Sequence, residues 1–213
     1  MTATAPRSPS ALVLVLHGYG SDAAGMEWLV AELAARLMHA AVVALDGPEQ
    51  APGGGRRWFD IAGVLEGGRG PRVRAALPAV ERQVVEALAS VGLDHSALAL
   101  VGFSQGATTA LQYAASAEAT PRAVVALAGR LAGAIDFPVS GRPAALLGHG
   151  TADPVIPVGE MADAAKRLSA AGFDVTTSAT PGLGHTISPA QVDDAVRFLR
   201  ATLPGGSPTQ EGM

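Results

Sequence analysis

The sequence has 213 residues, of which 48% are hydrophobic and 16% charged, with a formal net charge of −4 and no cysteine. That length suits a single α/β domain, and so apolar a chain is not a disordered one. The charges form no basic block, which argues against a nucleic-acid partner. Without cysteine, disulfides, thiolate metal sites and cysteine nucleophiles are excluded.

The two ends differ in composition from the middle. Residues 1–10 and 204–213 are rich in Pro, Gly, Ser and Thr, and we expect flexible tails on either side of one domain over 11–203. The first ten residues lack the apolar core of a signal peptide, and the apolar run Ala11–Leu16 is too short to span a bilayer. We therefore expect a cytoplasmic monomer or homodimer with no membrane insertion.

Short apolar runs alternate with helical patterns along the chain. Continuous apolar runs predict buried strands, and a more exposed strand is expected last: 12–16, 41–45, 98–101, 124–128, 144–147 and 174–179. Apolar residues recur at helical spacing over 26–37, 80–88, 161–168 and 192–199. This alternation predicts an α/β fold with a mostly parallel sheet of about six to seven strands and helices on both faces. Ligands bind such sheets at the carboxyl ends of the strands.

One stretch departs from the alternation. Asp46–Pro71 is rich in Gly and Pro and contains Trp58, Phe59 and Ile61. A long loop in a compact domain is usually functional or disordered, and the aromatic residues favour a functional loop.

The strand expected at 98–101 leads into Gly102-Phe103-Ser104-Gln105-Gly106, a G-x-S-x-G pattern. In the α/β-hydrolase fold a strained turn of this kind lifts the serine hydroxyl above the sheet edge, and the glycines leave room for the neighbouring strand and helix. The letters alone also fit a glycine-rich turn with a capping serine. The strand before the turn and the amphipathic helix after it favour Ser104 as a nucleophile.

A nucleophilic serine needs an imidazole as its base, and in this fold the base comes last in the chain, after the acid. His149 and His185 follow Ser104. His185 lies in a loop after the last expected strand, where a base belongs, although a surface histidine is the alternative interpretation. His149 precedes the favoured acid, so we expect it to be structural.

The imidazole in turn needs a carboxylate that fixes its tautomer. Asp153 follows the strand expected at 144–147 through Gly148 and Gly150 and precedes Pro154, and it is the favoured acid. A turn-forming aspartate is the alternative interpretation. Asp136 is the competing acid, but it has no matching sequence signature.

Two backbone N–H groups are candidates for an oxyanion hole. The loop Leu16–Gly20 follows the first strand and supplies the N–H of Tyr19, and the N–H of Gln105 follows the nucleophile. We expect the His17 ring to fix that loop and Asp60 to organise its own loop rather than act as an acid. The apolar side chains expected to form the acyl-binding pocket are Trp58, Phe59, Phe103, Val155, Ile156 and Leu183.

Together these segments resemble the phospholipase/carboxylesterase family, which includes the acyl-protein thioesterases. The matching segments are Leu16-His17-Gly18-Tyr19-Gly20, Trp58-Phe59-Asp60-Ile61, Gly102-Phe103-Ser104-Gln105-Gly106, His149-Gly150-Thr151-Ala152-Asp153-Pro154-Val155-Ile156-Pro157 and Gly184-His185-Thr186-Ile187. The resemblance implies an α/β-hydrolase fold, a triad of Ser104, Asp153 and His185, and an oxyanion hole at Tyr19 and Gln105. Ala107 stands where the family often has glycine, and we expect it to be harmless.

The sequence thus predicts a serine carboxylic ester hydrolase acting through an acyl-enzyme on small to medium acyl esters. No large lid domain fits in the chain, so long triglycerides are not expected. We expect a small-molecule ester or thioester substrate, no cofactor and no metal. Alternatives are an acyl-protein thioesterase or lysophospholipase, a peptidase or perhydrolase, and a non-catalytic ligand-binding protein on the same fold.

Overall fold

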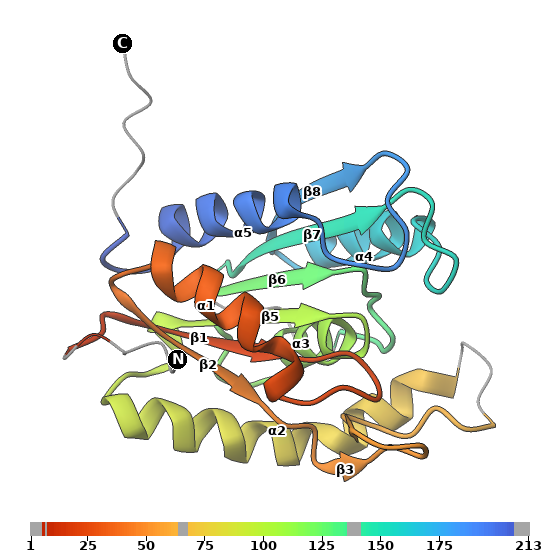
Figure 1. Cartoon of the computed structure of the whole chain (residues 1–213), viewed down its shortest axis with the longest axis horizontal. Helices are drawn as coiled ribbons and strands as arrows, with labels where there is room; N and C mark the ends of the chain where they lie inside the picture. The colour runs from red at the N-terminus through yellow and green to blue at the C-terminus, as the bar shows by residue number, and fades with distance from the viewer. Residues whose placement is uncertain (1–5, 7, 64–67, 136–141, 207–213) are drawn as a thin grey trace.

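The computed structural model describes residues 6, 8–63, 68–135 and 142–206 (Figure 1). At its centre is a six-stranded sheet with the strand order β2-β1-β5-β6-β7-β8, in which every neighbouring pair is parallel. The strands are β1 (Ala11–Leu16), β2 (Ala40–Leu45), β5 (Leu98–Phe103), β6 (Ala123–Leu127), β7 (Ala144–Gly150) and β8 (Asp174–Thr180). All of the strands expected from the sequence are therefore present.

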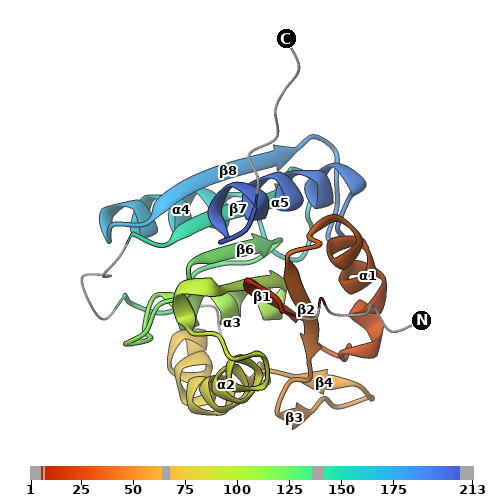
Figure 2. The ribbon, with the colours of Figure 1, turned by 90° about the vertical axis from the view of Figure 1, so that its left-hand side faces the viewer.

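Helices cover both faces of the sheet (Figures 1 and 2). On one face lie α1 (Glu27–Arg36) and α5 (Pro189–Thr202). On the other lie α2 (Arg69–Val91), α3 (Gln105–Ala114) and α4 (Gly159–Ala170). The short 3₁₀ helices η1 (Ala24–Met26) and η3 (His95–Ala97) precede α1 and β5. This architecture is the expected α/β-hydrolase fold.

The core forms two apolar layers, one on each face of the sheet. Leu12, Leu14 and Leu16 point into the layer under α2, α3 and α4. Val13 and Val15 point into the layer under α1 and α5. Because both faces of the inner strands are covered, both sets of alternating residues must be apolar, which explains the continuous runs in the sequence. Edge strand β8 is partly exposed along its length and is correspondingly rich in threonine.

The described parts of the stretch Asp46–Pro71, residues 46–63 and 68–71, contain more regular structure than its composition suggests. Strands β3 (Glu49–Gln50) and β4 (Arg56–Arg57) pair antiparallel in a small hairpin. Helix α2 begins at Arg69, well before the apolar pattern at 80–88. Its first turns carry several arginines and an internal Pro78, so they show little apolar periodicity, although Gly70 and Val73 are buried. Gly70 lies against the backbone of Ala132 and Gly133, and Val73 belongs to the core, so tertiary contacts accompany a helical start that propensity alone does not indicate.

The expected tails lie partly outside the described residues, which leave out 1–5, 7 and 207–213. Where the two ends are described, they touch: the Ser10 hydroxyl donates a hydrogen bond to the Pro204 carbonyl at 2.9 Å. Among the described residues, no helix is long and apolar enough to cross a membrane. The same residues contain no cluster of three or more His, Asp or Glu side chains arranged to hold a metal ion.

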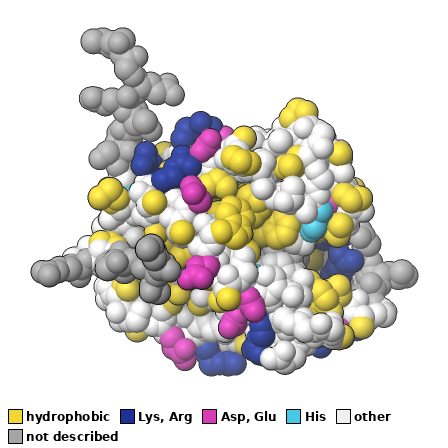
Figure 3. Space-filling model, viewed as in Figure 1, with side chains coloured by type: hydrophobic (Ala, Val, Ile, Leu, Met, Phe, Trp, Pro, Cys, Tyr) yellow, Lys and Arg dark blue, Asp and Glu magenta, His cyan; other side chains and the backbone are white. Residues whose placement is uncertain are grey.

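The parallel topology collects the loops that carry the candidate site residues. The loops after β1, β5, β7 and β8 all leave the sheet at its carboxyl edge, to the right in Figure 1. In the space-filling view of the same orientation, hydrophobic side chains gather near the middle of the face and a histidine is visible toward that edge (Figure 3).

The close packing of α3 on the end of β1 makes a prediction about stability. A Cβ atom added at Gly106 would lie 2.2 Å from the Leu16 carbonyl oxygen, a backbone atom that cannot easily move. Gly106→Ala should therefore lower the free energy of unfolding by about 1–3 kcal/mol, measured by urea denaturation.

Gly159→Ala is the matched control, because a Cβ added there meets no atom within 4 Å. It should leave stability unchanged or raise it by up to about 1 kcal/mol. Equal stability of Gly106→Ala and the unmodified chain would contradict the packing described here.

Candidate active site

Ser104 occupies a strained turn between β5 and α3. Its backbone has φ 55° and ψ −112°, a left-handed conformation that non-glycine residues rarely adopt. The turn is held by two backbone hydrogen bonds. The Ser104 N–H donates to the Leu127 carbonyl at 2.9 Å, and the Thr108 N–H donates to the Ser104 carbonyl at 3.0 Å. The surrounding structure thus over-determines the strained geometry.

The glycines of the G-x-S-x-G pattern are required by close backbone approaches. A Cβ at Gly102 would lie 2.5 Å from backbone atoms of Gly106 and Ala107. Ala107, the departure from the family pattern, is fully buried. Its methyl group lies where a side chain on Gly129 would reach, at 2.5 Å from a Cβ built there. The absence of a side chain at Gly129 therefore provides the space for the alanine.

The three predicted side chains meet at the carboxyl edge of the sheet. The Nε2 atom of His185 lies 2.8 Å from the Ser104 hydroxyl oxygen, and its Nδ1 atom lies 2.7 Å from Asp153 Oδ2. Because an ionised carboxylate only accepts hydrogen bonds, Nδ1 carries the hydrogen and Nε2 presents its lone pair to the hydroxyl. This is the tautomer that can remove a proton from Ser104.

The Asp153 side chain is completely buried yet well supplied with donors. Its Oδ1 atom accepts the N–H groups of Val155 at 2.8 Å and Ile156 at 2.9 Å. Burial would raise the pKa of Asp153, but the hydrogen bonds from His185, Ile156 and Val155 outweigh it and hold the pKa below its ordinary value. The group is therefore an ionised carboxylate at neutral pH.

His149 is buried beside the acid. Its Nε2 lies 2.8 Å from the Ile156 carbonyl oxygen, to which it donates a hydrogen bond, and 3.4 Å from Asp153 Oδ2. This fits the structural role expected for His149, but sequence reasoning missed its approach to the carboxylate itself. The competing acid, Asp136, lies outside the described residues.

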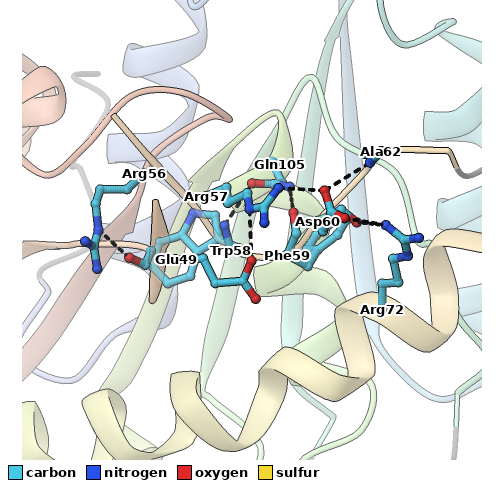
Figure 4. Close-up of polar contacts among 10 residues, drawn as sticks. Glu49, Arg56, Arg57, Trp58, Phe59, Asp60, Ala62, Arg72 and Gln105 are labelled. Carbon is cyan, nitrogen blue, oxygen red and sulfur yellow. Dashed lines mark hydrogen bonds and ion pairs between the residues drawn. The ribbon is translucent and has the colours of Figure 1, made fainter. Parts of the chain in front are cut away.

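Asp60 organises the loop before α2 (Figure 4). Its carboxylate accepts hydrogen bonds from the Ala62 N–H at 3.1 Å, from Arg57 at 2.6 Å and from Arg72 at 2.9 Å. The Ala62 hydrogen bond and the two arginines lower the pKa of Asp60. All of these contacts lie within its own loop and the start of α2, as expected for a loop organiser.

The two candidate oxyanion donors lie on elements that flank Ser104. Gln105 is the first residue of α3, so its N–H has no carbonyl partner within the helix. On the other side, a Cβ at Gly18 would lie 3.5 Å from the Ser104 Cβ, which places the loop after β1 directly against the serine. Tyr19 is the next residue of that loop.

The pocket candidates divide by burial. Trp58, Phe59 and Ile156 are buried, and the Trp58 side chain has no exposed surface. Phe103 is half-buried, and its ring lies 5.1 Å from the imidazole of His185. Val155 is 59% exposed, and Leu183 is half-buried in the loop that carries His185. Phe103, Val155 and Leu183 are therefore the candidates with surface to offer a substrate.

Comparison with known proteins gives consistent matches over most of the chain. The family model described as Phospholipase/Carboxylesterase matches residues 2–203. Esterase YpfH of Escherichia coli (strain K12) is 33% identical over 196 residues, which cover 91% of this chain and 83% of the relative. Acyl-protein thioesterase 1 of Gibberella zeae is 28% identical over 120 residues, covering 53% of this chain and 51% of the relative.

Solved structures agree with these matches. The crystal structure of esterase PE8 superposes with a TM-score of 0.83 at 29% identity, covering 94% of this chain and 96% of that one. Acyl-protein thioesterase 2 of Zea mays shares the fold, with a TM-score of 0.76 at 24% identity over 93% of this chain and 96% of that one. With a family match over almost its whole length, this chain belongs to the phospholipase/carboxylesterase family of α/β-hydrolases.

Proposed function

We propose that this chain hydrolyses carboxylic esters with Ser104 as nucleophile, His185 as general base and Asp153 as the acid that orients the base. The observation that carries the proposal is the unbroken hydrogen-bonded series from the Asp153 carboxylate through His185 to the Ser104 hydroxyl, at 2.7 and 2.8 Å. That geometry suits proton transfer from the hydroxyl to the imidazole.

The reaction proceeds in two stages. The Ser104 oxygen attacks the acyl carbonyl while His185 Nε2 takes its proton, and Asp153 stabilises the resulting imidazolium. The N–H groups of Gln105 and Tyr19 bind the oxyanion, and the positive end of α3 adds to this stabilisation. His185 then protonates the departing alcohol, leaving an acyl-enzyme. A water molecule activated by His185 hydrolyses that intermediate and regenerates the serine.

Small to medium acyl esters are the proposed substrates. Phe103, Val155 and Leu183 offer modest apolar surface close to the triad, and the similarity to esterase YpfH supports ester chemistry. Thioester hydrolysis is the second candidate, favoured by the similarity to acyl-protein thioesterase 1. Both reactions share the acyl-enzyme and differ in the leaving group. Comparing kcat/KM for matched oxygen and thiol esters across acyl lengths identifies the preferred bond.

Replacing the nucleophile tests the proposal directly. Ser104→Ala should lower kcat/KM for short p-nitrophenyl esters by about 10⁴-fold or more and abolish labelling by a fluorophosphonate, because no acyl-enzyme can form. Ser90→Ala is the control, since Ser90 is exposed on α2 and its hydroxyl donates a hydrogen bond to the Ala87 carbonyl of its own helix. Turnover of Ser104→Ala within a few-fold of the unmodified chain would reject the mechanism.

Replacing the acid tests the second link. Asp153→Asn removes the charge and can offer an N–H to Nδ1, which favours the wrong histidine tautomer, so kcat should fall by about 10⁴-fold. Asp163→Asn, at an exposed position on α4, should retain full activity. If Asp153→Asn kept full activity and Asp136→Asn lost it, Asp136 would be the acid instead of Asp153.

A further inference from the structure

The proposed mechanism needs two N–H donors at a defined separation, yet they belong to different elements. Tyr19 lies in the loop after β1, and Gln105 begins α3. Preorganised donors stabilise an oxyanion because they need no reorganisation during the reaction. Side chains outside the triad connect the two elements, and none of them has a role in the proton transfers.

The first connection is the Gln105 side chain, which is buried and reaches the Trp58–Phe59 segment (Figure 4). Its Oε1 accepts the Trp58 N–H at 2.9 Å, and its Nε2 donates to the Phe59 carbonyl at 2.7 Å. Because one end of the amide accepts and the other donates, these two contacts define its orientation. The first residue of α3 is thereby attached at two points to the Trp58–Phe59 backbone.

The second connection is the Trp58 indole. Its Nε1–H donates a hydrogen bond to the His17 carbonyl at 2.9 Å, and its ring lies 5.3 Å from the His17 imidazole. The side chain is fully buried, so this hydrogen bond does not compete with water. Trp58 thus links the end of β1 to the segment that Gln105 holds.

The third connection is the buried His17 ring. Its Nε2 accepts the Gly47 N–H at 2.9 Å, so the hydrogen resides on Nδ1, which donates to the Gly18 carbonyl at 2.7 Å. Burial lowers the pKa of His17, although the Gly18 carbonyl and the carboxylates of Asp46 and Asp22 oppose the effect. The ring is therefore neutral near pH 7, as this arrangement requires.

The Gly18 carbonyl and the Tyr19 N–H belong to the same peptide group. In a planar trans peptide these two bonds point in opposite directions. A carbonyl held toward His17 therefore directs the Tyr19 N–H away from it. The hydrogen bond to the carbonyl also polarises the peptide and makes its N–H a better donor.

We propose that His17, Trp58 and the Gln105 side chain form an oxyanion brace that sets the orientation and spacing of the Tyr19 and Gln105 N–H groups, with Trp58 as its central positioning residue. This inference rests on the proposed function. Its distinctive feature is that the contacts end on the backbone next to the two donors, whereas apolar packing alone needs no indole N–H.

Trp58→Phe tests the brace, because it keeps an aromatic ring beside His17 and removes the Nε1–H. We expect kcat to fall by about tenfold, with KM within twofold, because oxyanion stabilisation acts mainly in the transition state. The affinity for an alkyl trifluoromethyl ketone, which forms a tetrahedral adduct with Ser104, should fall by the same factor as kcat/KM. The affinity for the corresponding alcohol, which forms no oxyanion, should stay unchanged.

Trp28→Phe is the matched control, because Trp28 is the other tryptophan of the chain and is 49% exposed on α1. Its kinetics and its ketone affinity should match those of the unmodified chain. Gln105→Leu is a second brace variant that removes both amide contacts and retains the backbone N–H. It should show the same selective loss of kcat and ketone affinity, and it decides the question if Trp58→Phe does not fold.

Provided that hydrolysis by the unmodified chain depends on Ser104, two results overturn the brace. One is a folded Trp58→Phe or Gln105→Leu variant that keeps the original kcat. The other is a folded variant that loses affinity for the ketone and for the alcohol equally. It is also overturned if both variants unfold, since the residues would then act on the fold alone. An unmodified chain that neither hydrolyses esters nor forms the ketone adduct overturns the proposed function together with the brace.

Discussion

The site depends on how closely the start of α3 approaches the end of β1. Gly106 allows this approach, because a Cβ there would lie 2.2 Å from the Leu16 carbonyl oxygen. The same approach brings the loop after β1 against Ser104, whose own backbone is left-handed. One steric requirement thus places the Ser104 hydroxyl, the N-terminus of α3 and the loop after β1 next to one another.

The charge at the site is concentrated on one buried carboxylate. Within the part of the chain that the structure describes, the hydrogen bonds to Asp153 come from two amides and an imidazole, and none comes from an arginine or lysine. Neutral donors stabilise the anion without cancelling its field at His185. In the proposed mechanism, the carboxylate can therefore stabilise the imidazolium that forms when His185 takes the serine proton, which a carboxylate already paired with a cation would do less well.

The positions of the strands and the placement of Ser104, Asp153 and His185 at one edge of the sheet could be predicted from the sequence, because buried parallel strands and glycine-rich turns have strong local signatures. The sequence was less informative wherever long-range contacts decide the outcome. Trp58 was expected on a pocket wall, yet it is fully buried with its indole bonded to the His17 carbonyl, a partner 41 residues away. The early start of α2 likewise depends on packing, since Arg69–Pro78 carries little apolar pattern.

The contact between Ala107 and Gly129 has a consequence for sequence change in this protein. There is room for only one methyl group between the two positions. Ala107 on α3 carries it, and Gly129 in the segment after β6 carries none. Glycine at both would leave a small void between α3 and the segment after β6, and alanine at both would bring two methyl groups within 2.5 Å, so that one of the two segments would have to shift. The two residues are therefore coupled: moving the methyl group from one position to the other requires Ala107→Gly and Gly129→Ala together.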